Sequence, residues 1–174
     1  FNNSINYDYW GNENYYAAYV LPTLKMGKLT FIPGFRYEKN ITNYSAIQHG
    51  PEGKWNEPFA YDTATTEREN DYIFPMIHTK YKLSENLDIR ASYTQTLSRP
   101  SYGQIIPRVA YWGKNLYWNN PQLEPAESNN YDLYLTYSGD KTGLITVGGF
   151  YKNISGFIYN TTSYLADSAD ITDT

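Results

Sequence analysis

The sequence predicts an all-β fold of antiparallel, up-and-down strands that form part of a large transmembrane β-barrel. Three observations predict this fold class. Apolar and polar residues alternate with a period of two over several segments, as they do in half-buried strands. Short turns and long connections alternate along the chain, as they do in outer-membrane barrels. Tyrosine, which suits strands and membrane interfaces, occurs 20 times in 174 residues.

The clearest strand is expected at Leu87–Leu97. Its odd-numbered residues are apolar except Gln95, whereas its even-numbered residues are polar or charged. A helix would spread Asp88 and Arg90 around its circumference, so the pattern favours a strand. The segment also has about the length that a tilted strand needs to cross a bilayer, roughly 9–11 residues.

Further strands are expected on both sides of this segment. Proline cannot donate a hydrogen bond to a neighbouring strand, so we expect a bulge or a frayed ladder at Pro33 and at Pro75. Alternation predicts strands at Lys28–Glu38, Ile73–Leu83 and Tyr131–Ser138; strands whose facing the sequence does not assign are expected at Tyr15–Leu24 and Leu144–Ile154, and a seventh is expected to start near Phe157.

The connections indicate how the strands are oriented. Tight turns are expected at Met26–Lys28, Ser84–Asn86 and Gly139–Lys141, where glycine or polar residues occur. Long connections are expected at Gln48–Arg68 and Arg99–Asn130. In an outer-membrane barrel the short turns face the periplasm and the long loops face the exterior.

Composition excludes several classes of protein. The formal charge of −4 without a basic cluster argues against a nucleic-acid partner. The longest uncharged apolar run, Tyr15–Pro22, is far shorter than the roughly 20 residues of a membrane-spanning helix. The chain has no cysteine, and its two histidines, His49 and His78, stand at no zinc-binding spacing. No glycine-flanked nucleophilic serine occurs, so we expect no catalytic site, metal or cofactor.

Three short motifs carry a family resemblance. The chain reads A-S-Y-T-Q-T-L-S-R-P up to Pro100, then N-P-Q-L-E-P-A-E-S-N-N-Y-D-L up to Leu133, then G-F-Y-K-N-I. This ordered series resembles the C-terminal barrel region of TonB-dependent receptors over about Lys28–Tyr159. One departure is Ala126, because the family more often has a glutamate directly after the proline. The residues that carry the resemblance are Leu97, Ser98, Arg99, Pro100, Asn120, Pro121, Leu123, Pro125, Glu127 and Tyr131.

The resemblance implies an outer-membrane active transport receptor rather than an enzyme. Barrels of this class have about 22 strands, so residues 1–174 would form six or seven strands of one barrel domain, with the plug domain absent from this chain and both ends cut through loops. The implied partners are outer-membrane lipid, the receptor's own plug, the TonB complex through that plug, and possibly a surface lipoprotein. The implied cargo is an extracellular iron chelate, haem, oligosaccharide or similar ligand.

Aromatic residues in the two long connections are candidates for ligand contact. Aromatic faces stack on sugars and on flat chelates. The alternative is that these rings pack within their own loops or form the outer aromatic girdle. We also expect Arg99 and Glu127 to lie close together and brace the base of the second connection. The candidates are Arg108, Tyr111, Trp112, Tyr117 and Trp118 in one connection, and Trp55 with Phe59 and Tyr61 in the other.

Two alternatives share most of these features. A passive outer-membrane porin has the same kind of barrel without a plug. A soluble β-sandwich that binds glycans through aromatic loops has the same strand alternation, but its apolar face packs on a second sheet of the same domain. The sheet's partner on its apolar side therefore distinguishes the sandwich from the barrel.

Overall fold

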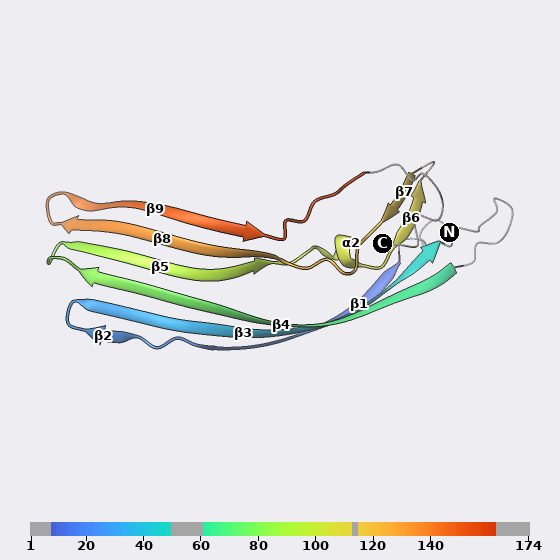
Figure 1. Cartoon of the computed structure of the whole chain (residues 1–174), viewed down its shortest axis with the longest axis horizontal. Coiled ribbons are helices and arrows are strands. Elements are labelled where there is room, and N and C mark those ends of the chain that lie inside the picture. Colours follow the sequence, from blue (N-terminus) through green and yellow to red (C-terminus); the bar gives the residue numbers. More distant parts are fainter. Residues whose placement is uncertain (1–7, 50–60, 113–114, 163–174) are drawn as a thin grey trace.

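The computed structural model describes residues 8–49, 61–112 and 115–162. They form one antiparallel sheet of seven strands and a separate two-stranded hairpin (Figure 1). The strand order is β1-β3-β4-β5-β8-β9, with β2 beside β3. The elements are β1 Tyr9–Val20, β2 Leu24–Met26, β3 Leu29–His49, β4 Tyr61–Lys82, β5 Leu87–Ser98, α2 Tyr102–Ile105, β6 Val109–Trp112, β7 Asn115–Trp118, β8 Ala126–Gly139 and β9 Gly143–Ser155.

The predicted strands are confirmed, but four of them are longer than the alternation indicated. The strand expected at Tyr15–Leu24 begins at Tyr9 and is broken at residues 21–23 into β1 and β2. β3 continues to His49, β4 begins at Tyr61 and β8 begins at Ala126. The expected loop up to Arg68 is therefore partly strand. These extensions carry polar residues on both faces, which removes the period-two signal. The seventh strand expected near Phe157 is not present, because residues 156–162 form neither strand nor helix.

The three tight turns lie at one end of the sheet, and the strand ends that flank the long connections lie at the other (Figure 1). Gly27 and Gly143 adopt positive φ angles of 57° and 72°. Side chains with a Cβ rarely adopt that conformation, so glycine suits both turns. The segregation of short and long connections predicted from the sequence is thus confirmed.

The prolines interrupt ladders without forming bulges. Pro33 pairs with Ile77 and Pro75 with Phe35 in one unbroken register between β3 and β4. On the other side of β3, strands β1 and β2 keep the same register and are interrupted where Pro22 would face Pro33. The ladder between β4 and β5 ends at Met76, next to Pro75. Of the two alternatives expected at these prolines, the structure has the frayed ladder and not the bulge.

The strand registers align apolar residues of five strands in a row on one face of the sheet. Leu29 pairs with Tyr81, Tyr81 with Ile89, Ile89 with Leu135, and Leu135 with Val147. The apolar row therefore runs unbroken across five strands. Val147 is 68% exposed and Leu135 is 44% exposed. No second sheet of the described residues packs on this face, unlike the sheet pair of a sandwich.

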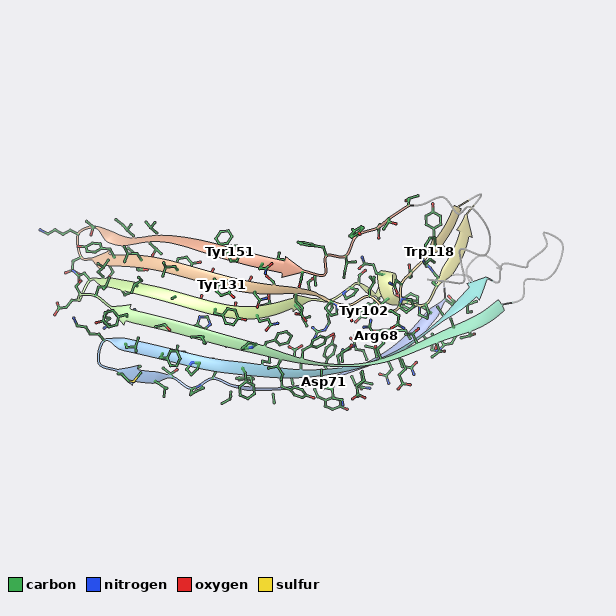
Figure 2. All side chains as sticks on the ribbon, viewed as in Figure 1. Arg68, Asp71, Tyr102, Trp118, Tyr131 and Tyr151 are labelled. Carbon is green, nitrogen blue, oxygen red and sulfur yellow. The ribbon has the colours of Figure 1, made fainter. Side chains whose placement is uncertain are left out.

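Tyrosines border the apolar face on the side of the long connections. Tyr93, Tyr131 and Tyr151 are direct neighbours on three adjacent strands, and Figure 2 shows the latter two side by side. Their ring centroids are 5.0 Å apart between β5 and β8 and 6.1 Å apart between β8 and β9. Beyond this row the same face becomes polar, at Gln95 and Asn129. A tyrosine row at an apolar-to-polar boundary is typical of a membrane-interface girdle.

Helices contribute little to this structure. No helix in the part of the chain that the structure describes has the length and apolar character of a membrane span.

Candidate functional site

The connection between β5 and β8, residues 99–125, crosses the polar inner face of the sheet, and we call it the strap. It contains α2 and the hairpin β6–β7 and lies inside the bend that β3 and β4 make (Figure 1). Between the strap and the sheet lies a cavity of about 330 Å³. Its walls include Glu13, Asn40, Asn70 and Tyr72 from the strands, and Tyr102 and Leu123 from the strap.

Arg99 anchors the first half of the strap. Its Nη2 donates to Oε2 of Glu38 at 2.5 Å. Its guanidinium carbon lies 5.0 Å from the ring centre of Tyr15 and 5.7 Å from that of Tyr72. A cation over aromatic faces is attracted by the ring quadrupole, and more strongly when it is desolvated. Arg99 is thus held by the carboxylate of Glu38 on β3 and by the rings of Tyr15 on β1 and Tyr72 on β4.

The expected brace between Arg99 and Glu127 is wrong. The carboxylate that Arg99 binds is Glu38, whose other oxygen accepts from Nε of Arg36 at 2.6 Å. Glu127 instead stands opposite Leu97 in the ladder between β5 and β8. That register puts Glu127 on the outer face, because odd-numbered positions of both strands point there, whereas the strap crosses the inner face.

Glu13 anchors the middle of the strap. Its carboxylate accepts hydrogen bonds from Nδ2 of Asn40 at 2.8 Å and from the hydroxyl of Tyr102 at 2.9 Å. Burial alone would raise the pKa of this carboxyl group, but interactions with the side chains of Asn40, Tyr15, Tyr102 and Tyr44 outweigh burial and hold the pKa below its usual value. Glu13 therefore stays ionised and binds the strap in its charged form.

Arg68 anchors the returning half of the strap. Its Nη1 donates to the carbonyl oxygen of Pro121 at 3.1 Å and to that of Leu123 at 2.6 Å. These carbonyls belong to a turn in which the amide of Leu123 donates to the carbonyl of Asn120 at 3.2 Å. The side chain of Asn120 also accepts from the amide of Gln122 at 2.9 Å. Proline at the second position of such a turn presets its backbone angle, which explains the Asn-Pro-x-Leu motif.

The short helix α2 is fixed by local contacts. The Oε1 atom of Gln104 accepts from the backbone amide of Ser101 at 2.8 Å and from its hydroxyl at 2.9 Å. The amide of Ile106 donates to the carbonyl of Tyr102 at 3.0 Å, and Ile106 is buried. Nδ2 of Asn119 donates to the carbonyl of Ile106 at 3.0 Å, which ties the two halves of the strap together.

Tyr44 forms the buried floor of the cavity. It is 7% exposed, and its ring meets that of Tyr102 edge-on with centroids 5.9 Å apart. The ring lies over Gly11 on the neighbouring strand, where a Cβ would come within 2.2 Å of Cδ1 of Tyr44. The hydroxyl of Tyr44 makes no hydrogen bond within the described part of the chain. A buried, unpaired hydroxyl is costly, so this atom is available to a ligand.

The predicted aromatic candidates lie farther from the sheet, in the hairpin β6–β7. The backbone of Arg108 precedes it, donating to the carbonyl of Ile106 at 2.7 Å and accepting from the amide of Asn119 at 3.1 Å. Tyr117 and Trp118 are both about half exposed (Figure 2 labels Trp118). Consecutive strand residues point to opposite faces, so a ligand on one side contacts only one of them.

The remaining candidates are located by backbone alone or not at all. Tyr111 pairs with Leu116 and Trp112 with Asn115 in the hairpin. Tyr61 is the first residue of β4 and pairs with His49. Trp55 and Phe59 lie outside the described residues. Ligand contact by these aromatic residues stays a prediction.

Sequence reasoning missed most of the cavity's residues. Glu13 and Asn40 lie outside the strands and connections expected from the sequence, and Arg68 is the last residue of an expected connection. Tyr102 was not singled out among 20 tyrosines. The usable signal was the even-numbered series after Glu38 on β3, because it continues the polar face predicted for the start of that strand. No group of three histidine, cysteine or acidic side chains in the described ranges could hold a metal ion.

Comparisons with known proteins agree with this architecture. Residues 1–170 match the family described as TonB dependent receptor-like, beta-barrel. No protein among the curated ones is similar enough to count as a match. Among solved structures, the closed form of the ferric-catecholate import receptor Fiu from Escherichia coli K12 is similar, with a TM-score of 0.64 and 17% sequence identity. The similarity covers 86% of this chain and 22% of that chain, so this chain spans about a fifth of that receptor.

Proposed function

Because this chain belongs to the TonB dependent receptor-like β-barrel family, we propose that it forms part of the barrel wall of an outer-membrane importer. The seven-stranded sheet is then one arc of a barrel of about 22 strands. The plug domain lies elsewhere in the same receptor and sits inside the barrel. The TonB complex acts on that plug. The cargo is an extracellular ligand that the receptor admits to the periplasm.

One observation carries this proposal. The apolar row from Leu29 to Val147 is solvent-exposed and uncovered, while the opposite face carries charged residues and the strap. An exposed apolar surface that spans five strands would be unstable in water. Lipid chains on one side and an enclosed polar interior on the other satisfy both faces at once.

The direction of the barrel in the membrane follows from its connections. The turns at Gly27 and Gly143 face the periplasm, and the strap lies on the extracellular side. The row of Tyr93, Tyr131 and Tyr151 then marks the outer membrane interface. A ligand arriving from outside meets the hairpin β6–β7 first and the cavity beneath the strap next.

The candidate cargoes are an iron chelate, haem, an oligosaccharide or a similar molecule. The similar receptor Fiu is described as importing ferric catecholate, and that cargo is one candidate for this chain. The aromatic residues of the hairpin, including Tyr117 and Trp118, suit first contact with any flat or ring-shaped ligand.

The experiment that tests the proposal uses the full-length receptor in its own outer membrane. We expect the protein to require detergent for extraction and ligand uptake to stop when TonB is deleted or the proton motive force is dissipated. Cutting back residues 111–118 is expected to weaken ligand binding while the barrel still assembles. Uptake that continues without TonB would identify a passive porin, and extraction without detergent would identify a soluble sandwich.

A further inference from the structure

We propose that the cavity beneath the strap binds one ring of a neutral polyhydroxylated ligand, a sugar residue of an oligosaccharide, rather than an anionic iron chelate. This inference rests on the proposed importer function and specifies its cargo. Three properties of the cavity support it. The protein itself already binds the two arginine side chains at the cavity, the other polar groups on the walls can bond to hydroxyl groups, and the volume suits a single ring.

The cations at the cavity are already engaged by the protein. Of the described residues that line it, Arg68 and Arg99 carry positive charge. Arg99 binds Glu38 and lies against two tyrosine rings, and Arg68 donates to two strap carbonyls. The carboxylate of Glu13 also faces the cavity. A ferric tris-catecholate complex carries several negative charges and would be repelled by this carboxylate without gaining an unengaged cation.

The remaining polar groups match hydroxyl groups in both directions. Each carboxylate oxygen of Glu13 accepts one hydrogen bond, from Asn40 or from Tyr102, and a ligand O–H group can add to or replace one of them. The buried hydroxyl of Tyr44 has no partner and can donate to a ligand oxygen. The amide of Asn70 on the cavity wall both donates and accepts. Sugar hydroxyls supply donors and acceptors together, whereas metal-bound catecholate oxygens have lost their protons.

The size and shape of the cavity fit one ring. A volume of about 330 Å³ is near the lower end of small-molecule pockets, which span roughly 300–1,000 Å³. The exposed ring of Tyr102 at its edge offers an apolar face for the C–H groups of a sugar (Figure 2).

The experiment measures binding to the purified full-length receptor in detergent by isothermal titration calorimetry. The probes are cellotetraose, maltotetraose and mannotetraose, with a soluble ferric tris-catecholate complex as the competing class. Tyr44→Phe removes the unpartnered hydroxyl and keeps the ring over Gly11. Asn70→Ala removes the wall amide. Asn43→Ala is the matched control, because Asn43 lies on β3 at an odd-numbered, outward-facing position.

We expect at least one neutral tetrasaccharide to bind, and each cavity variant to weaken its affinity roughly 3- to 10-fold, the effect of one lost hydrogen bond. The control variant should bind as the unaltered receptor does. Binding of the ferric complex alone, binding of neither class, or saccharide binding that both cavity variants leave unchanged would each overturn the inference. TonB-dependent uptake of another cargo in those cases would leave the proposed importer function standing.

Discussion

Arg99, the residue that follows strand β5, forms an ion pair with Glu38 on strand β3, 61 positions earlier in the chain, with 2.5 Å between Nη2 and Oε2. β3 and β5 are not neighbours in the sheet, because β4 lies between them. The ion pair therefore fixes the start of the strap across an intervening strand. The fold of the inner face depends on this long-range contact and on those of Glu13 and Arg68.

Replacing Arg99 should loosen the strap. Arg99→Ala removes the bond to Glu38 and the contacts with Tyr15 and Tyr72. Because the side chain is about one third exposed, we expect a loss of about 1 kcal/mol, or roughly 5-fold faster amide exchange at Ile106. Hydrogen exchange read by mass spectrometry measures this. Arg36→Ala is the control, since Arg36 binds the same glutamate but belongs to β3 and not to the strap. Equal acceleration in both variants would contradict the assignment.

Acidification should also release the strap. The pKa of Glu13 in the folded protein lies below the usual value of 4.5. The carboxylate therefore stabilises the strap above about pH 4.5, and this stabilisation is lost as the pH falls through the lower folded pKa. The carboxylate of Glu38, which binds Arg99, is a second group whose protonation weakens the attachment of the strap. Strap amide exchange, corrected for its intrinsic pH dependence, should rise below pH 4.5, and Glu13→Gln should reduce that rise. If the strap exchange rate rises as much in Glu13→Gln as in the unaltered protein, Glu13 is not the group responsible.

A charge on the apolar face should prevent the barrel from folding in lipid. Ala91 lies on that face of β5, opposite Leu133, whereas its neighbour Ser92 lies on the inner face and donates to Asp132 at 2.9 Å. Ala91→Arg is expected to cost about 2–4 kcal/mol in the bilayer. Ser92→Arg places the same group beside a carboxylate and should cost much less. Folding of the full-length receptor into lipid vesicles measures both, and equal costs would contradict the assignment of faces.

A methyl group at Gly11 should displace the floor of the cavity. The new Cβ would lie 2.2 Å from the ring of Tyr44, and it would also approach the backbone oxygen of Asn43 within 3.1 Å. A Cβ at Gly148 on β9 would likewise clash with the ring of Tyr134 on β8. Gly11→Ala should lower the thermal stability of the strap region, whereas Gly149→Ala, with no atom within 4 Å, should not. Hydrogen exchange of the strap amides, measured at increasing temperature, distinguishes the two variants.

The sequence predicted the half of the sheet next to the tight turns better than the half next to the long connections. Leu87–Leu97 was predicted almost to the residue because one face of β5 is apolar and the other polar, a contrast that the period-two pattern reports directly. Beyond Glu38 on β3 and before Ile73 on β4 both faces are polar. Because alternation shows no such contrast there, residues 39–47 and 69–72 were assigned to no element, and residues 61–68 were expected to be loop.

The cavity could not be predicted because its contacts are long-range. Glu13 and Tyr102 are 89 positions apart, and Arg68 and Leu123 are 55 apart. No local pattern encodes such pairs. The motif residues Arg99 and Pro121 were recognised by resemblance, but their partners were not, and the guess of Glu127 for Arg99 failed because register placed Glu127 on the other face.

The central claim is that the face of this sheet that carries Leu133 and Leu135 contacts lipid, and that the face that carries Asp132 and Tyr134 lines an enclosed interior. The most direct test places single spin labels at positions 131 to 137 of the full-length receptor in lipid vesicles and measures their accessibility to oxygen and to a water-soluble nickel complex. The structure predicts high oxygen and low nickel accessibility at Leu133 and Leu135, and the reverse trend at Asp132 and Tyr134. Accessibility that does not alternate with a period of two would contradict the claim.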